Sequence, residues 1–121
     1  MNLFAQLFGG AGGNRNNLSA AEYKSRYVET KTAHLLVDVR SPQEFAEGHI
    51  AGAKNIPLQE FQQRMKQIPQ NQPIMLYCRS GNRSGMALQM MQSAGYEEVF
   101  NVGGIGALAA QGLPLKERKL A

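Results

Sequence analysis

The chain has 121 residues, 43% of them apolar and 18% charged, so it is long enough for one domain with its own core and too short for two. With 13 Lys and Arg residues against 9 Asp and Glu residues, its net charge of +4 suits anionic small molecules or an acidic partner, but no basic stripe interleaved with aromatics points to nucleic acid. The single cysteine excludes an internal disulfide and any metal site built from several cysteines, and no run of 18 apolar residues is present that could cross a membrane.

Residues 1–17 are expected to form a flexible or amphipathic N-terminal segment ahead of a domain at residues 18–121. If the start of the chain is helical, four apolar side chains share one face of that helix: Leu3, Phe4, Leu7 and Phe8. The glycines within residues 9–13 indicate a linker after them. Two interpretations stay open: a frayed or self-docking end, or a handle for a partner, a second subunit or a lipid surface. No basic stretch typical of a signal peptide precedes the apolar residues, so a cytoplasmic location is expected, where reducing conditions suit a lone thiol.

Two capping boxes mark the first helices of the domain. Ser19 with Glu22 predicts a helix over residues 20–28, and Ser41 with Glu44 predicts a short helix that starts at Pro42 and stops at Gly48. Between them, residues 35–39 form a short apolar run rich in branched side chains, as in a strand buried on both faces.

The rest of the chain continues the alternation of strands and helices. We expect strands at residues 54–56, 73–78 and 98–102, and helices at residues 58–68, 84–94 and from the glycine pair at 103–104 to Gly112. This alternation predicts an α/β fold with a small open parallel sheet and helices on both faces. Ligands of such sheets bind beyond the carboxyl ends of the strands, where Cys78, residues 38–40 and the glycine pair can meet.

The chemistry is expected at the lone cysteine. Cys78 ends an apolar strand, a short loop follows, and a helix begins behind it, so unpaired backbone N–H groups and the positive end of the helix dipole face one spot. Arg79 and Arg83 add two charges, so the pKa of the Cys78 thiol should fall below the ordinary value of about 8.5. Such a thiolate is a nucleophile for anionic sulfur, phosphorus or arsenic centres.

The loop at residues 78–83 resembles the active-site loop of single-domain rhodaneses, the thiosulfate sulfurtransferases. Five further motifs fall in the order and spacing of that family, over roughly residues 18–115: Asp38-Val39-Arg40, Glu44-Phe45, Gly48-His49-Ile50 with Gly52-Ala53, Asn55-Ile56-Pro57 and Gly103-Gly104. The resemblance implies a rhodanese-like fold, no metal or organic cofactor, and transfer of sulfane sulfur from thiosulfate or a persulfide through a Cys78 persulfide. It also implies an acceptor such as cyanide, glutathione, thioredoxin or another sulfur-relay protein.

The length of the loop decides between the chemistries considered. Four residues separate Cys78 from Arg83, whereas phosphatases that resemble rhodaneses have a longer loop to surround a tetrahedral phosphate. A sulfurtransferase is therefore favoured over a phosphatase or arsenate reductase. A non-catalytic sulfur-carrier or partner-binding module stays open as the main alternative.

The resemblance assigns roles to the loop residues that follow the cysteine. Their backbone amides would hold the terminal persulfide sulfur, and the two arginines would attract the anionic donor; the set is Arg79, Ser80, Gly81, Asn82, Arg83 and Ser84. Gly81 is expected to supply a positive φ or a close approach of the backbone to the substrate. Ser84 is expected either to donate to the sulfur or to act as the helix N-cap.

Several other residues are expected to have structural roles. Asp38 and Arg40 should fix the loop, through an Asp38–Arg83 or an Arg40–Glu44 pair. Of the two histidines, His49 is expected to be hydrogen-bonded in the fold, and His34 carries no functional signal. The methionines of the helix after the loop are expected to pack in the core, with Met86 at the border of the pocket. Leu108 stands where many rhodaneses have a tryptophan.

Overall fold

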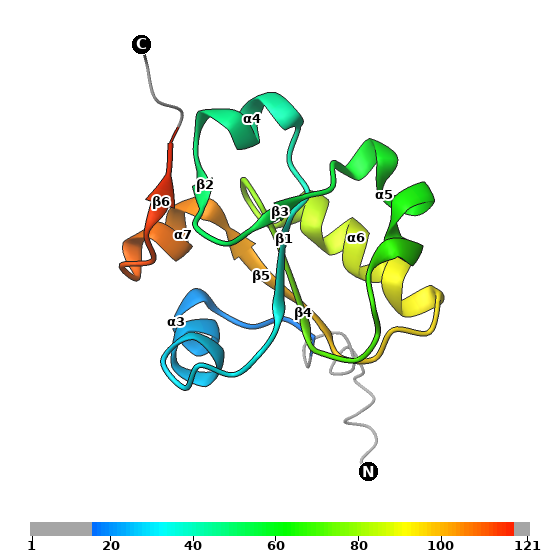
Figure 1. Ribbon diagram of the computed structural model, residues 1–121, viewed down its shortest axis with the longest axis horizontal. Helices are drawn as coiled ribbons and strands as arrows, with labels where there is room; N and C mark the ends of the chain where they lie inside the picture. The colour runs from blue at the N-terminus through cyan, green and yellow to red at the C-terminus, as the bar shows by residue number, and fades with distance from the viewer. Residues whose placement is uncertain (1–15, 118–121) are drawn as a thin grey trace.

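A four-stranded sheet forms the centre of the computed structural model, which describes residues 16–117 (Figure 1). All its neighbouring strands are parallel, in the order β3-β1-β4-β5. The strands are β1 (Leu35–Asp38), β3 (Lys54–Asn55), β4 (Ile74–Cys78) and β5 (Val99–Gly104). The predicted α/β fold with a parallel sheet is confirmed.

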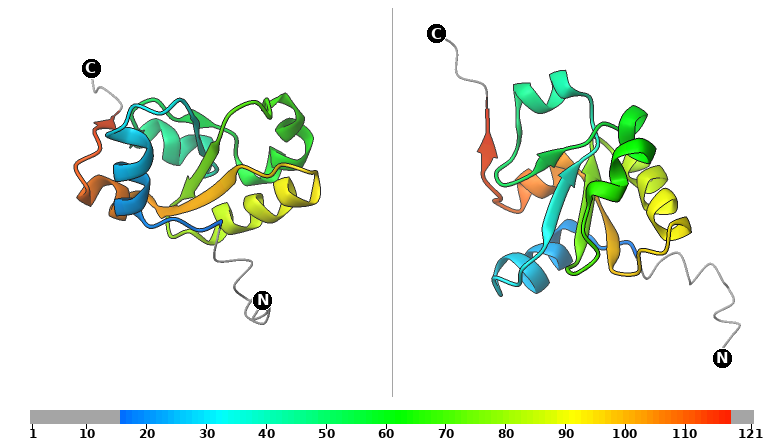
Figure 2. Two further views of the ribbon diagram at one scale, coloured as in Figure 1. Left: turned by 90° about the horizontal axis from the view of Figure 1, so that it is seen from below. Right: turned by 45° about the vertical axis from the view of Figure 1, so that its right-hand side comes forward.

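Helices cover both faces of this sheet, as Figure 2 shows. One face carries α3 (Ala20–Tyr23), the π-helical turn η1 (Lys24–Val28) and α7 (Ile105–Ala110). The other face carries α5 (Leu58–Arg64), the 3₁₀ turn η2 (Met65–Gln67) and α6 (Asn82–Ser93). The predicted helices at residues 20–28 and 58–68 are therefore present, but each changes its helical type partway.

The buried strand β4 divides its side chains between the two cores because successive residues of a strand point to opposite faces. Met75 and Tyr77 pack on the α3 and α7 side. Ile74, Leu76 and Cys78 pack on the α5 and α6 side. The thiol of Cys78 therefore belongs to the face that α6 covers.

Both predicted capping boxes form. The hydroxyl of Ser19 accepts from the N–H of Glu22 at 3.0 Å, and that of Ser41 accepts from the N–H of Glu44 at 3.1 Å. The second box starts α4 (Pro42–Glu47), which ends at Gly48 as expected and has no buried residue. Polar contacts, and not core packing, therefore hold α4 in place.

Two short strands that the sequence did not predict form a second, antiparallel sheet. β2 (His49–Ile50) pairs with β6 (Leu115–Lys116). Each strand has only two residues, too few to produce an alternating pattern. The pairing ties the end of the described chain to the segment that follows α4.

The chain enters the domain beside β5. The carbonyl of Asn16 accepts from the N–H of Asn101 at 2.8 Å, and the N–H of Leu18 donates to the carbonyl of Asn101 at 3.0 Å. Asn17, between them, forms a parallel bridge with Asn101, so the last two residues of the predicted N-terminal segment contact the sheet. The apolar residues Leu3, Phe4, Leu7 and Phe8 lie outside the described residues.

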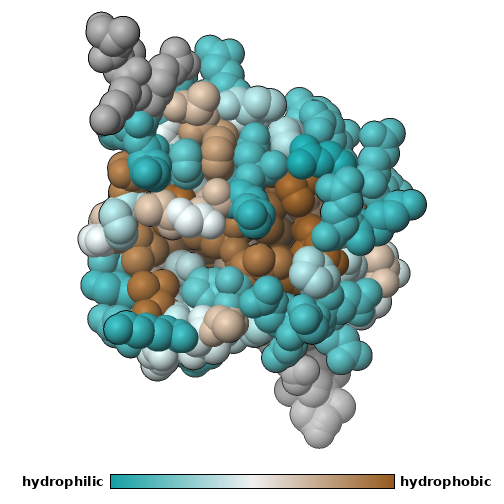
Figure 3. Space-filling model, in the orientation of Figure 1, coloured by the Kyte–Doolittle hydropathy of each residue, from teal (hydrophilic) through white to brown (hydrophobic). Residues whose placement is uncertain are grey.

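An apolar band crosses the middle of the face shown in Figure 3, where β1 and β3 lie in Figure 1. A pocket of about 340 Å³ at this edge of the sheet is lined by apolar side chains that include Leu35, Val37 and Ile56, together with Lys54 and Arg64. β3 is the outer strand of the sheet here. Hydrophilic residues surround the band.

Candidate active site

Cys78 is the last residue of β4, and its sulfur accepts two hydrogen bonds from the loop and helix that follow. The backbone N–H of Gly81 donates to Sγ at 3.0 Å, and the hydroxyl of Ser84 lies 3.4 Å from Sγ. Only 1% of Cys78 is exposed, so the thiol lies beneath the loop and not at its surface. The loop therefore surrounds the sulfur with hydrogen-bond donors while keeping it largely from solvent.

These donors shift the ionisation of the thiol. Burial raises its pKa, but the hydroxyl of Ser84 and the backbone N–H groups of Ser84, Gly81 and Ser80 together lower the pKa of Cys78 below its ordinary value. Burial is the largest single influence on this pKa, and the influences that lower it are hydrogen bonds, whereas the sequence also suggested the charges of the two arginines. The thiolate that these hydrogen bonds stabilise is the nucleophilic form of cysteine.

Gly81 allows the chain to turn from the loop into α6. Its φ is +100°, a conformation that residues with a Cβ rarely adopt, and it is the N-cap of α6. The helix begins at Asn82, so the interpretation of Ser84 as N-cap is wrong. Ser84 is the third residue of the helix, in its first turn, and is fully buried with its hydroxyl 3.4 Å from the thiol sulfur.

The glycine pair at residues 103–104 allows β5 to lie directly against the loop. A Cβ at Gly104 would overlap the carbonyl oxygen of Arg79 and would stand 3.3 Å from Cα of Ser80. The pairing of β4 with β5 shifts register here, because Leu76 faces Asn101 whereas Cys78 faces Gly104. Contrary to the prediction of a turn at the glycines, β5 continues through them, and the extra residue makes a bulge under the loop.

Two arginines near the site form ion pairs, but not the pairs that the sequence suggested. Arg83 donates to both carboxylate oxygens of Glu44, at 2.8 and 3.1 Å. Arg40 binds the fully buried Asp38 at 2.7 Å and also donates to the carbonyl of Gly48. The proposed Asp38–Arg83 and Arg40–Glu44 pairs are therefore wrong: Arg40 reaches Asp38 two residues earlier in the chain, which leaves Glu44 for Arg83.

Glu44 joins the thiol loop to α4. Its oxygens accept from Arg83 and also from the N–H of Ser41 in the capping box. The bonds from Arg83 in particular lower the pKa of Glu44 to about 2, so the carboxylate stays charged at every physiological pH. The pair fixes Arg83 at the edge of the site, where it is less available to a substrate.

Arg79, by contrast, makes no ion pair or hydrogen bond within residues 16–117, and its neighbour Ser80 and the helix residue Asn82 are also exposed. Arg79 borders a surface pocket of about 320 Å³, lined by Arg40, Glu44, Glu47, Gly48, Arg79 and Ile105. This guanidinium is therefore free to meet an anion at the mouth of the site.

Asn101 is the residue of the site that the sequence analysis missed. It lies in the middle of β5, and its side chain accepts from the hydroxyl of Ser84 at 2.8 Å and donates to the carbonyl of Gly81 at 3.1 Å. A polar side chain between the buried Val99 and Val102 interrupts an apolar strand, and that is the signal that could have identified it.

The remaining residues singled out in the sequence lie apart from the thiol. Nδ1 of His49 bonds the carbonyl of Phe45 at 2.9 Å, and Nε2 of His34 bonds the hydroxyl of Tyr23 at 2.7 Å. Met86 is 55% exposed, in a groove between α5 and α6, and Leu108 is buried in the core on the α3 and α7 side.

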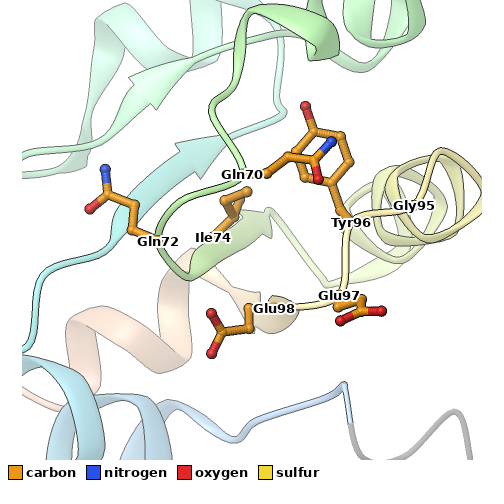
Figure 4. A pocket seen from close by; sticks show the side chains of 7 residues that line it. All are labelled: Gln70, Gln72, Ile74, Gly95, Tyr96, Glu97 and Glu98. Carbon is orange, nitrogen blue, oxygen red and sulfur yellow. The ribbon is translucent and has the colours of Figure 1, made fainter.

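The pocket in Figure 4, of about 340 Å³, lies at the start of β4, away from Cys78, and contains none of the predicted site residues.

Within the described part of the chain, no helix is both long and apolar enough to cross a membrane. Nor do residues 16–117 bring together three His, Cys, Asp or Glu side chains that could hold a metal ion.

Comparison with protein families gives a match over most of the domain. The model of the rhodanese-like domain family matches residues 19–111. A sulfurtransferase from Allochromatium vinosum is 39% identical over 101 residues, which cover 83% of this chain and 94% of that protein. An uncharacterised protein of Bacillus subtilis is 40% identical over 87 residues, 72% of this chain, and the match covers 66% of its length. Other relatives are named thiosulfate sulfurtransferase or proposed as a sulfur carrier.

Solved structures give the same result. A rhodanese from Escherichia coli, determined with anions, is 33% identical and superposes with a TM-score of 0.63 over 70% of this chain and 99% of that one. A rhodanese-related protein from Thermoplasma volcanium is 29% identical, with a TM-score of 0.73 over 84% of this chain and 97% of that one.

Proposed function

Because the chain belongs to the rhodanese-like domain family, we propose that it is a sulfurtransferase, which receives sulfane sulfur on Cys78 and passes it to a thiol or to cyanide. The observation that carries this proposal is the set of donors around one sulfur atom. Sγ of Cys78 accepts from the N–H of Gly81 at 3.0 Å and lies 3.4 Å from the hydroxyl of Ser84, at the N-terminus of the twelve-residue helix α6. These groups stabilise negative charge on a thiolate and on a persulfide sulfur attached to it.

The reaction has two displacements. The Cys78 thiolate attacks the outer sulfur of thiosulfate, a new S–S bond forms, and the S–S bond of thiosulfate breaks with its electron pair leaving on sulfite. The Cys78 persulfide keeps its terminal sulfur as an anion among the loop donors. An acceptor thiolate or cyanide then attacks that terminal sulfur, and the Cys78 thiolate is regenerated.

Arg79 is the group that attracts the donor. It is exposed and unpaired within residues 16–117, whereas Arg83 is held by Glu44 and Arg40 by Asp38. A positive charge at the mouth increases the local concentration of an anion such as thiosulfate. A lone free thiol persists best in a reducing compartment, and we propose the cytoplasm.

The test measures the intact mass of the protein after incubation with thiosulfate, followed by thiocyanate release on addition of cyanide. We expect a mass increase of one sulfur atom that cyanide removes, and neither event in Cys78→Ser. Gln89→Ala, on the exposed side of α6, is the matched control and should behave as the wild type. Sulfur loading in Cys78→Ser would overturn the proposal.

A sulfur carrier without rapid turnover of small donors is the second candidate, and the 1% exposure of Cys78 is the observation that favours it. A thiol under a closed loop reacts slowly with free molecules unless a docked partner moves the loop. Fast loading from a protein persulfide together with slow thiocyanate production would identify the carrier; fast production from thiosulfate identifies the enzyme. Hydrolysis of an aryl phosphate, which neither candidate predicts, would instead point to the phosphatase.

A further inference from the structure

The hydroxyl of Ser84 lies between two acceptors but has a single hydrogen to donate. Its oxygen is 2.8 Å from Oδ1 of Asn101 and 3.4 Å from Sγ of Cys78. The first distance is that of a strong O–H···O bond. The two contacts therefore compete for one proton.

The orientation of the Asn101 amide follows from its other partners. The backbone N–H of Gly103 can only donate, and it lies 3.0 Å from Oδ1. The carbonyl of Gly81 can only accept, and it lies 3.1 Å from Nδ2. Hence the atom that faces the hydroxyl of Ser84 is an acceptor.

We propose that Asn101 is a positioning residue that sets the direction of the Ser84 hydroxyl, which turns from Asn101 to the sulfur when the sulfur becomes an anion. With a neutral thiol, the S–H of Cys78 donates to Oγ of Ser84 and Ser84 donates to Oδ1 of Asn101. When the thiol proton leaves to solvent, the hydroxyl rotates and donates to the thiolate. No bond between heavy atoms changes, and Gly103 continues to donate to Oδ1.

This arrangement supplies a hydrogen bond to the sulfur only in its charged forms, the thiolate and the persulfide anion. When Cys78 ionises, the hydrogen bond from Ser84 to Asn101 is broken. Because this bond stabilises only the neutral form of the site, Asn101 raises the thiol pKa relative to a site without that acceptor. A hydrogen bond contributes about 0.5–1.5 kcal/mol net, which corresponds to roughly half to one pKa unit.

The charged groups around the thiol act on it separately from this switch. They come from the loop, from α6, from the end of β1 and from α4: Arg79, Arg83, Asp38, Arg40 and Glu44. Within residues 16–117, no hydrogen bond or ion pair joins any of their side chains to Ser84 or Asn101. Their influence should therefore be unchanged by substitutions at those two positions.

The test is a double-mutant cycle on the pH profile of Cys78 alkylation by iodoacetamide. The thiol pKa is measured in four proteins: the wild type, Asn101→Ala, Ser84→Ala and the variant with both substitutions. Any effect of Asn101 through Gly81 occurs in both backgrounds and cancels. We expect Asn101→Ala to lower the thiol pKa when Ser84 is present. The change should be more negative, by about half to one unit, than the change that the same substitution causes in the Ser84→Ala background. Equal shifts, or a difference of the opposite sign, would overturn the inference.

A second measurement needs no variant at Asn101, in case Asn101→Ala does not fold. The NMR shift of the Asn101 side-chain carbonyl carbon should titrate with the midpoint of Cys78, because Oδ1 loses the Ser84 hydrogen on ionisation. In Ser84→Ala this titration should largely disappear, and a titration of unchanged size would overturn the inference. The inference rests on the proposed function for the role of the thiolate, but neither measurement uses a sulfur donor, so a failure of sulfur transfer would be seen separately.

Discussion

Gly104→Ala tests whether the contact between β5 and the thiol loop positions the donors of the site. The backbone of Gly104, with φ −103° and ψ 154°, suits any residue, so the substitution acts through space alone. The new Cβ would overlap the carbonyl oxygen of Arg79 and would stand 3.1 Å from its carbonyl carbon. Both atoms belong to backbone, and relieving the overlap requires a movement on the order of 1 Å.

A movement of that size in the loop would lengthen the 3.0 Å contact from the N–H of Gly81 to Sγ of Cys78 to about 4 Å, where little of the hydrogen bond remains. Loss of a hydrogen bond to a charged group costs about 1.5–3 kcal/mol, so the pKa of the thiol should rise by about 1–2 units. Overpacking should also reduce the free energy of unfolding by about 1–3 kcal/mol.

The assays are the pH profile of iodoacetamide alkylation, urea unfolding and thiocyanate production. Gly106→Ala is the matched control, because its Cβ would meet nothing within 4 Å and it lies in α7. The control should keep the thiol pKa and gain roughly 0.5–1 kcal/mol of stability. If Gly104→Ala had the thiol pKa and the stability of the wild type, the loop would not depend on this contact.

Three further outcomes follow from the charges of the site. Because the pKa of Glu44 falls from 4.5 to about 2 in the folded protein, its pair with Arg83 adds stability above pH 4.5 that is lost as the pH falls toward 2. Glu44→Gln should remove this part of the pH dependence, on the order of 1 kcal/mol in urea unfolding, and an unchanged profile would contradict the assignment. Arg40→Ala leaves the carboxylate of Asp38 buried without its partner and should destabilise the protein by about 3–5 kcal/mol, whereas a cost below 1 kcal/mol would mean that the carboxylate finds other partners. Alkylation of Cys78 should reach half its maximal rate at a lower pH than alkylation of the same cysteine in an unstructured peptide, because the pKa of the folded thiol is lowered, and an equal or higher midpoint would exclude a stabilised thiolate.

The sequence predicted the architecture well because its signals are local. Ser19 and Ser41 start their helices through capping boxes formed within four residues, and the apolar runs at β1 and β4 are those of buried strands. The short pair β2 and β6 could not be predicted, since their partners lie far apart in the sequence and each strand has two residues.

The sequence correctly predicted that Cys78 ends a strand and that Gly81 has a positive φ, because both depend on a strand, a loop and a helix that follow one another in the chain. It failed for the ion pairs of the two arginines and for Asn101, whose partners are brought close only by the fold. Arg83 reaches Glu44, which is 39 residues away, and Asn101 of β5 reaches Ser84 of α6. Charge and hydrogen-bonding capacity were visible in the sequence, but the distances that select one partner over another are set by the packed fold.

The helix α4 has a thermodynamic consequence for the protein. It buries none of its six residues, and its links to the domain include the ion pair at Glu44, the contacts of Phe45 with His49, and the bond from Arg40 to the carbonyl of Gly48 at its end. A segment without buried side chains opens at a lower free energy than the strands beneath it. Its amides should therefore exchange with deuterium before those of β4. Changes on its outer surface can alter the border of the site while the sheet keeps its stability.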